Sequence, residues 1–134
     1  MTVGLSAVNT ANALLAVLRG NAAGTTFTAP AVQAVKLHTA DPGSAGTTAA
    51  AAGDTTRKAI GYGAPSGGSM SMSTTPPVWT NGGTTETLTH ITVWDSTTAG
   101  NFQYSAALTA SQAWANGNTF TLTTLTFSLT PIAA

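Results

Sequence analysis

Cysteine is absent from the 134 residues of the chain. Its absence excludes disulfide bonds and metal sites built on thiolates. A fold without disulfide bonds or such metal sites must be stabilised by a hydrophobic core, and a chain of this length can bury one. We therefore expect a single domain over residues 1–134, assembled in a reducing compartment.

Charged side chains are scarce, at 6% of the chain against about 25% in ordinary soluble domains. Four basic and four acidic residues cancel to a net charge of zero. Nucleic-acid binding needs clustered bases, and only Arg57 and Lys58 are adjacent. An anionic membrane surface is disfavoured for the same reason. We expect neither nucleic acid nor membrane as a partner.

The surface must instead be built largely from Thr, Ser, Ala and Gly. A surface this poor in charge, on a chain with no net charge, tends to associate. We therefore expect much of it to meet neighbouring subunits in a large assembly, with a homo-oligomer as one form. A free monomer with a threonine-rich surface is the alternative.

Long hydrophobic runs are also missing, so the sequence predicts no membrane-spanning helix. Segment 1–20 contains a short apolar run, but its only base, Arg19, follows that run. A secretion signal carries its bases first. We expect this segment to belong to the mature protein.

Residues 6–20 predict the one helix. Ser6 can cap its start, Arg19 suits its negative end, and Gly20 suits the left-handed position after it. Apolar residues at spacings of three and four share one face: Val8, Ala11, Leu15 and Leu18. This face indicates docking, either on the protein's own sheet or on another protein.

Residues 31–130 predict an all-β fold, an antiparallel sandwich or barrel of about seven or eight short strands. The expected strands cover 31–39, 56–62, 69–74, 78–80, 87–95, 102–108 and 119–129. Residues 41–54 are small and polar, which predicts a long exposed loop or a contact arm.

The last expected strand has a break in its alternation. Phe120 and Leu122 share one face, whereas Leu125, Phe127 and Leu129 are out of phase with them. One β-bulge at Thr123–Thr124 would bring all five apolar residues to the core side. We predict that bulge.

His38 and Asp41 pose the question of catalysis, because they are close enough in sequence to share a proton. Pro42 and Gly43 are typical of a turn, in which the Asp41 carboxylate accepts backbone N–H groups. A catalytic histidine also needs a nucleophile, and no serine stands in an activated motif. The turn explains the stretch, so we expect neither catalysis nor a cofactor.

Other candidate chemistry is weaker. His38, His90, Asp41 and Asp95 are possible metal ligands by type, but their spacing predicts no site, and we expect no metal. Aromatic residues in a small sandwich usually fill its core, and Trp94 closes an apolar strand. Trp79 and Trp114 remain candidates for contact with a glycan, with Trp114, beside a turn, the better exposed anchor.

Three motifs together resemble a family of small tailed-phage structural proteins, usually labelled tail-fibre or minor tail proteins. They are LHTADPG at 37–43, RKAIGYGAPSGG at 57–68 and THITVWDSTTAGN at 89–101. The resemblance covers about residues 13–111 and departs from the family at 47–54, TTAAAAGD. It implies structural or assembly roles for the motif residues Leu37, His38, Asp41, Pro42, Gly43, Trp94 and Asp95.

The resemblance implies a virion component made in the host cytoplasm. A compact domain with few charges favours a capsid decoration or cement protein, bound to the major capsid protein or other virion proteins. It would form a closed oligomer, for which a trimer is one possibility. The alternative is a minor tail, tail-fibre or tail-tip protein involved in host-surface recognition.

Overall fold

The computed structural model describes residues 3–20 and 29–130. One helical segment and nine strands make up this part of the chain. The elements are β1 (Gly4–Leu5), η1 (Ala7–Ala11), α1 (Asn12–Leu18), β2 (Gln33–His38), β3 (Lys58–Ile60), β4 (Ser69–Ser71), β5 (Val78–Thr80), β6 (Glu86–Trp94), β7 (Phe102–Trp114), β8 (Thr119–Thr121) and β9 (Thr126–Ser128). The all-β class with one N-terminal helix is confirmed.

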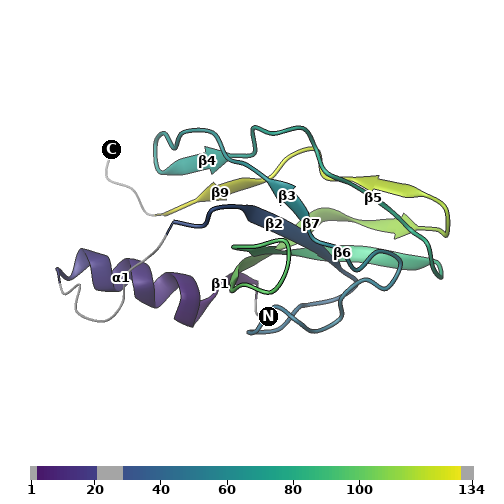
Figure 1. The fold of residues 1–134 in the computed structure, drawn as a ribbon, viewed down its shortest axis with the longest axis horizontal. Coiled ribbons are helices and arrows are strands. Elements are labelled where there is room, and N and C mark those ends of the chain that lie inside the picture. The colour runs from purple at the N-terminus through teal and green to yellow at the C-terminus, as the bar shows by residue number, and fades with distance from the viewer. Residues whose placement is uncertain (1–2, 21–28, 131–134) are drawn as a thin grey trace.

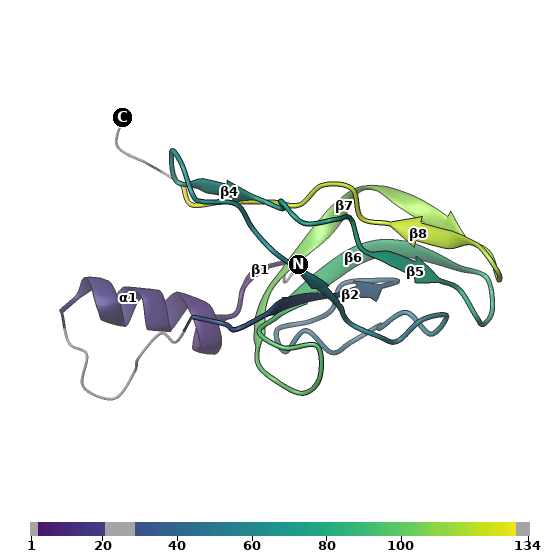
Figure 2. The same cartoon turned by 45° about the horizontal axis from the view of Figure 1, so that its top comes forward.

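The strands form two layers (Figures 1 and 2). One is a five-stranded antiparallel sheet in the order β1-β7-β6-β2-β3, and the other consists of two ribbons, β4-β9 and β5-β8. The core lies between the layers. It takes alternate residues of the large sheet, such as Val35, Leu37 and Val93, and side chains of the ribbons, such as Trp79.

The helical segment starts at Ser6, whose hydroxyl accepts the Asn9 N–H, and Gly20 has a left-handed φ of 74°. Both expected end signals are therefore confirmed. The first turn, η1, is a π-helix, and the α-helix proper begins only at Asn12. Ala13 is buried, whereas Leu15 and Leu18 are exposed. The segment projects from the sandwich (Figure 1). Val8, Leu15 and Leu18 of its predicted apolar face are exposed.

Segment 41–54 is a long loop with several exposed residues, as predicted, but it does not form a free arm. Pro42 and Ala51 are fully buried, and the Ala51 N–H bonds to the Leu37 carbonyl at 2.9 Å. Gly46 lies so close to Phe102 that a Cβ there would be 2.5 Å from the ring. Small residues let this loop pack flat on the outer face of the large sheet.

The predicted bulge at Thr123–Thr124 is wrong. The strand ends at Thr121 and a second one begins at Thr126, because the chain leaves β5 and crosses to β4. The crossing segment turns both Leu122 and Leu125 inward, to 6% and 8% exposure. The out-of-phase pattern marks a change of partner, and Leu129 remains half exposed.

A large bulge occurs in β7 instead. Leu88 pairs with Gln112 and His90 with Ala107, so residues 108–111 lie opposite Thr89 alone. This bulge lengthens β7 well past its predicted end at Leu108 and carries the chain to Trp114.

Candidate functional site

His38 is fully buried on the outer face of the large sheet, under the 41–54 loop. Its Nδ1 lies 2.8 Å from the Thr48 carbonyl oxygen, and its Nε2 lies 2.9 Å from the Thr92 hydroxyl. Because a carbonyl can only accept, Nδ1 carries the proton and Nε2 accepts from Thr92. Thr92 in turn accepts the Trp94 indole N–H at 2.8 Å. The result is a chain of hydrogen bonds running in one direction.

This arrangement favours a neutral imidazole. Burial lowers the pKa of His38 below its ordinary value of 6.5, against the opposing effect of the Thr48 carbonyl. Asp41 accepts the Gly43 N–H at 2.9 Å, which confirms the predicted turn. Both nitrogens of His38 are thus engaged by backbone and threonine. These hydrogen bonds join the LHTADPG motif, through His38, to the THITVWDSTTAGN motif, through Thr92 and Trp94.

A second network closes the turn after β6. The Arg57 guanidinium lies 3.7 Å from the centre of the Trp94 ring and donates to the carbonyls of Ser96 and Ala99. Burial lowers the pKa of Arg57, and the nearby Asp95 carboxylate opposes that effect. Such a stacked, forked contact suits arginine and not lysine.

Asp95 holds the other side of the same turn. Its two oxygens accept the Asn101 backbone N–H at 2.6 Å and the Asn101 side-chain amide at 2.9 Å. Gly100 has a φ of 74°, and a Cβ there would run into the Asp95 carboxylate. The residues of the WDSTTAGN stretch therefore support one another, and this turn has a structural explanation.

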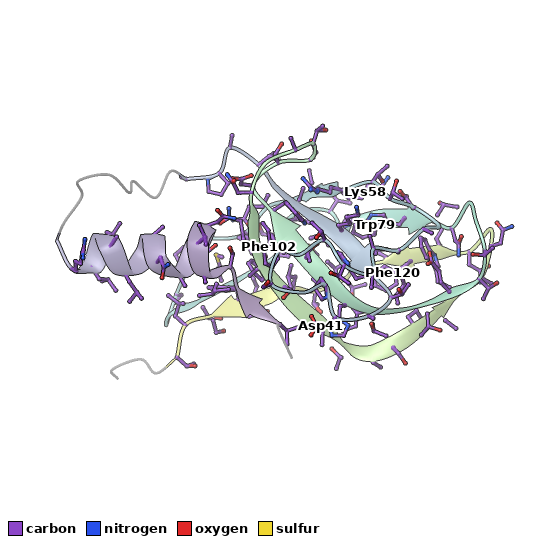
Figure 3. The ribbon with its side chains drawn as sticks, turned by 90° about the horizontal axis from the view of Figure 1, so that it is seen from below. Asp41, Lys58, Trp79, Phe102 and Phe120 are labelled. Atoms are coloured by element: carbon purple, nitrogen blue, oxygen red, sulfur yellow. The ribbon has the colours of Figure 1, made fainter. Side chains whose placement is uncertain are left out.

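Trp79 and Trp114 are not exposed anchors. Trp79 is 0% and Trp114 is 1% exposed. Their indole N–H groups donate to the Thr56 carbonyl at 3.0 Å and the Asn118 carbonyl at 2.9 Å. Figure 3 shows Trp79 and Phe120 in the body of the sandwich, and the two rings lie 6.1 Å apart. Neither indole is available to stack on a glycan. Trp94 is also buried, as predicted.

Within residues 3–20 and 29–130, no group of three or more His, Asp or Glu side chains is placed to hold a metal ion. His38 and His90 pair across β2 and β6, but Asp95 serves the turn at the end of β6. In the same part of the chain, no helix is long and apolar enough to cross a membrane.

Two of the surface hollows formed by the described residues bear on function. One, of about 430 Å³, lies between the β7 bulge and the crossing segment 122–125. Its rim is rich in threonine, including Thr109, Thr123 and Thr124. It offers hydroxyl groups but carries no charged side chain, so it has no evident catalytic chemistry.

The other hollow, which we call the apolar groove, has a volume of about 360 Å³. It lies where η1 and α1 meet the sandwich, and its walls come from β1, α1, β4, β7 and β9. Its principal apolar side chains are Leu5, Leu14, Met70, Phe127 and Leu129. Sequence reasoning missed this groove, because its walls meet only through tertiary contacts.

Exposed apolar side chains gather next to this groove. Val8 is 76%, Leu15 61% and Leu18 82% exposed. We call these three residues the outer helix face. They are three of the four residues whose spacing predicted a docked face, and in the described structure this face does not dock on the sandwich. The closed motif networks and this open apolar region together suggest a building block of an assembly.

Comparison with known families bears on that suggestion. Residues 4–130 match the model of the family described as podophage GP4 fiber I protein gp80. The chain belongs to this family. No curated protein matches the chain.

Membership in the gp80 fibre family identifies a structural protein of the phage virion. This confirms the coarse expectation drawn from the three motifs, including a location in the virion. The family's description is at least as consistent with the tail-fibre alternative as with capsid decoration.

Proposed function

We propose that the chain is a structural subunit of a podophage tail fibre, joined to neighbouring virion proteins through its N-terminal helical segment. The family supports the fibre. The observation that supports the mode of attachment is the outer helix face, with Leu18 82% exposed beside a sandwich whose tryptophans are all buried.

The role proposed is mechanical and not enzymatic. His38 and Asp95, which carry the most suggestive chemistry, serve hydrogen bonds that hold loops in place. Their partners are backbone groups and neighbouring polar side chains. A rigid, charge-poor sandwich suits repeated packing against other subunits of a fibre.

The proposal is tested by locating and counting the protein in purified virions. Gold-labelled antibodies against this chain should mark the tail in electron micrographs, with antibodies against the major capsid protein as the control for shell labelling. Quantitative mass spectrometry should give far fewer copies of this chain than of the major capsid protein. Labelling spread over the shell at a copy number close to that of the capsid protein would instead establish a decoration protein.

A further inference from the structure

No residue of segments 3–20 and 29–130 fills the apolar groove. Its lining carries no charged side chain, and its volume is about 360 Å³. A cavity of about 150 Å³ already accepts a benzene-sized apolar group. The groove therefore has room for two or more aliphatic side chains.

One polar atom in the groove also lacks a partner. Gln33 lines the groove, and its Oε1 is buried without a hydrogen bond to any described residue. A buried acceptor without a donor costs roughly 1–3 kcal/mol. Because this oxygen is already closed off from solvent, an occupant with an N–H or O–H donor would reach it after the Gln33 side chain turns toward the groove.

The outer helix face has the complementary character. Its aliphatic side chains are exposed, whereas Leu14, one helical turn before Leu18, is half-buried in the wall of the groove. The polar groups beside the face are Asn12 and Arg19, both exposed and both able to donate hydrogen bonds. In Figures 1 and 2 the helix extends beyond the sandwich, where a neighbour can reach it.

We propose that the outer helix face of one copy of this chain inserts into the apolar groove of the next copy. The two surfaces differ, so the contact is head-to-tail and each copy uses both. Such contacts close into a ring or continue as a filament, according to the rotation between copies. The inference names the partner of the surface discussed above and rests on the proposed fibre role for its biological setting.

Charge favours a second copy as the occupant. Within residues 3–20 the one charged side chain is Arg19, at the end of the helix, and the lining of the groove carries none. A charged partner would lose hydration on binding and gain no ion pair. A second copy brings no charge that the groove would repel. One repeated contact then covers both the outer helix face and the apolar groove.

The test uses the full-length chain and two variants that each close one surface. Leu18→Lys changes the outer helix face, and Leu129→Lys changes the groove, where Leu129 is 49% exposed. Val78→Lys is the matched control, because Val78 is 47% exposed but lies on β5 outside both surfaces. Circular dichroism and thermal unfolding check that each variant is folded.

Sedimentation velocity over a concentration series gives the readout. We expect the unmodified chain and Val78→Lys to associate alike, and each of the other two variants to associate at least tenfold more weakly. An equimolar mixture of Leu18→Lys and Leu129→Lys should form dimers and nothing larger, since one intact helix face meets one intact groove. The other contact, between the Leu18→Lys helix face and the Leu129→Lys groove, should not form because it would place one lysine against another.

Two results would overturn the proposal. The first is an unmodified chain that stays monomeric at every concentration tested. The second is a mixture that stays as monomeric as its two components, because that result indicates a symmetric contact between helices or a different partner. Neither result bears on the tail location, which is measured on virions, so the failure of each proposal is recognised separately.

Discussion

The outer face of the large sheet and the N-terminal helical segment present a contrast in how apolar and polar groups are satisfied. Around His38 and Trp94, side chains are buried and each polar group has a partner within the chain. Around Leu15 and Leu18, aliphatic side chains are exposed and nothing in the described structure covers them. One region is complete as a monomer, and the other has the composition of an interface before its partner is bound.

The contrast separates two uses of an apolar residue. In the sandwich, burial of large side chains drives folding, and a single truncation leaves a cavity. On the helix, an exposed leucine contributes little to folding and becomes useful only on association. Substitutions in the two regions should therefore differ in which equilibrium they disturb.

The largest expected effect comes from truncating a core tryptophan. Trp79→Ala removes a fully buried ring that packs on Phe120, so it should lower the free energy of unfolding by about 3–5 kcal/mol. Leu18→Ala should change it by less than about 0.5 kcal/mol, because Leu18 is 82% exposed. Urea unfolding measures both, at concentrations low enough to keep the chain monomeric.

Equal losses for the two variants would break the contrast between the regions. They would mean that the helix face is already buried against the sandwich in solution. A small loss for Trp79→Ala would instead mean that the core around it is loosely packed.

The two regions also differ in how far sequence predicts them. Ser6, Gly20 and the turn at Asp41 follow from local rules, because a cap or a turn is satisfied within a few residues. The apolar spacing of the helix predicted a docking face, and that face is exposed in the described structure. The spacing left open what the face docks on, since it carries no information about the partner.

Predictions failed where tertiary packing overrides local character. Trp114 stands beside a turn, yet the β7 bulge carries it into the core. The glycine- and alanine-rich loop 41–54 has the composition of a free arm, but its small residues let it lie flat on the sheet. The apolar groove draws its walls from segments nearly the whole chain apart, so no local pattern marks it.

The second prediction concerns Thr92, the residue that links His38 to Trp94. Thr92→Val keeps the shape of the side chain but leaves His38 Nε2 and the Trp94 N–H without their partner. We expect a loss of about 2–3 kcal/mol in unfolding free energy, because both groups stay buried. Thr92→Ser is the control, since it keeps the hydroxyl and should lose about 1 kcal/mol for the missing methyl group.

The measurement is again urea unfolding, supported by tryptophan fluorescence, which reports on the surroundings of the indoles. A Thr92→Val protein as stable as the unmodified chain would mean that the hydrogen-bond chain does not stabilise the fold. The hydrogen bonds that link the His38 motif to the Trp94 motif would then contribute nothing to the free energy of unfolding.

The smallest effect is the dependence of stability on pH. Because burial lowers the pKa of His38 in the folded state, the unfolded chain takes up its proton first as the pH falls. Stability should be full above the ordinary histidine pKa of 6.5 and should decline as the pH drops below it. For one proton, the slope reaches at most about 1.4 kcal/mol per pH unit.

Two neighbours bear on this titration. Lys36 on the same strand and His90 on the paired strand both disfavour a proton on His38, which strengthens the dependence. Unfolding free energies between about pH 5.5 and 8 should therefore show the decline in the unmodified chain, and His90→Gln should keep most of it. His38→Gln should be less stable at neutral pH but nearly independent of pH over this window. A decline that survives intact in His38→Gln would place the titrating group elsewhere, and the network under the 41–54 loop would no longer account for it.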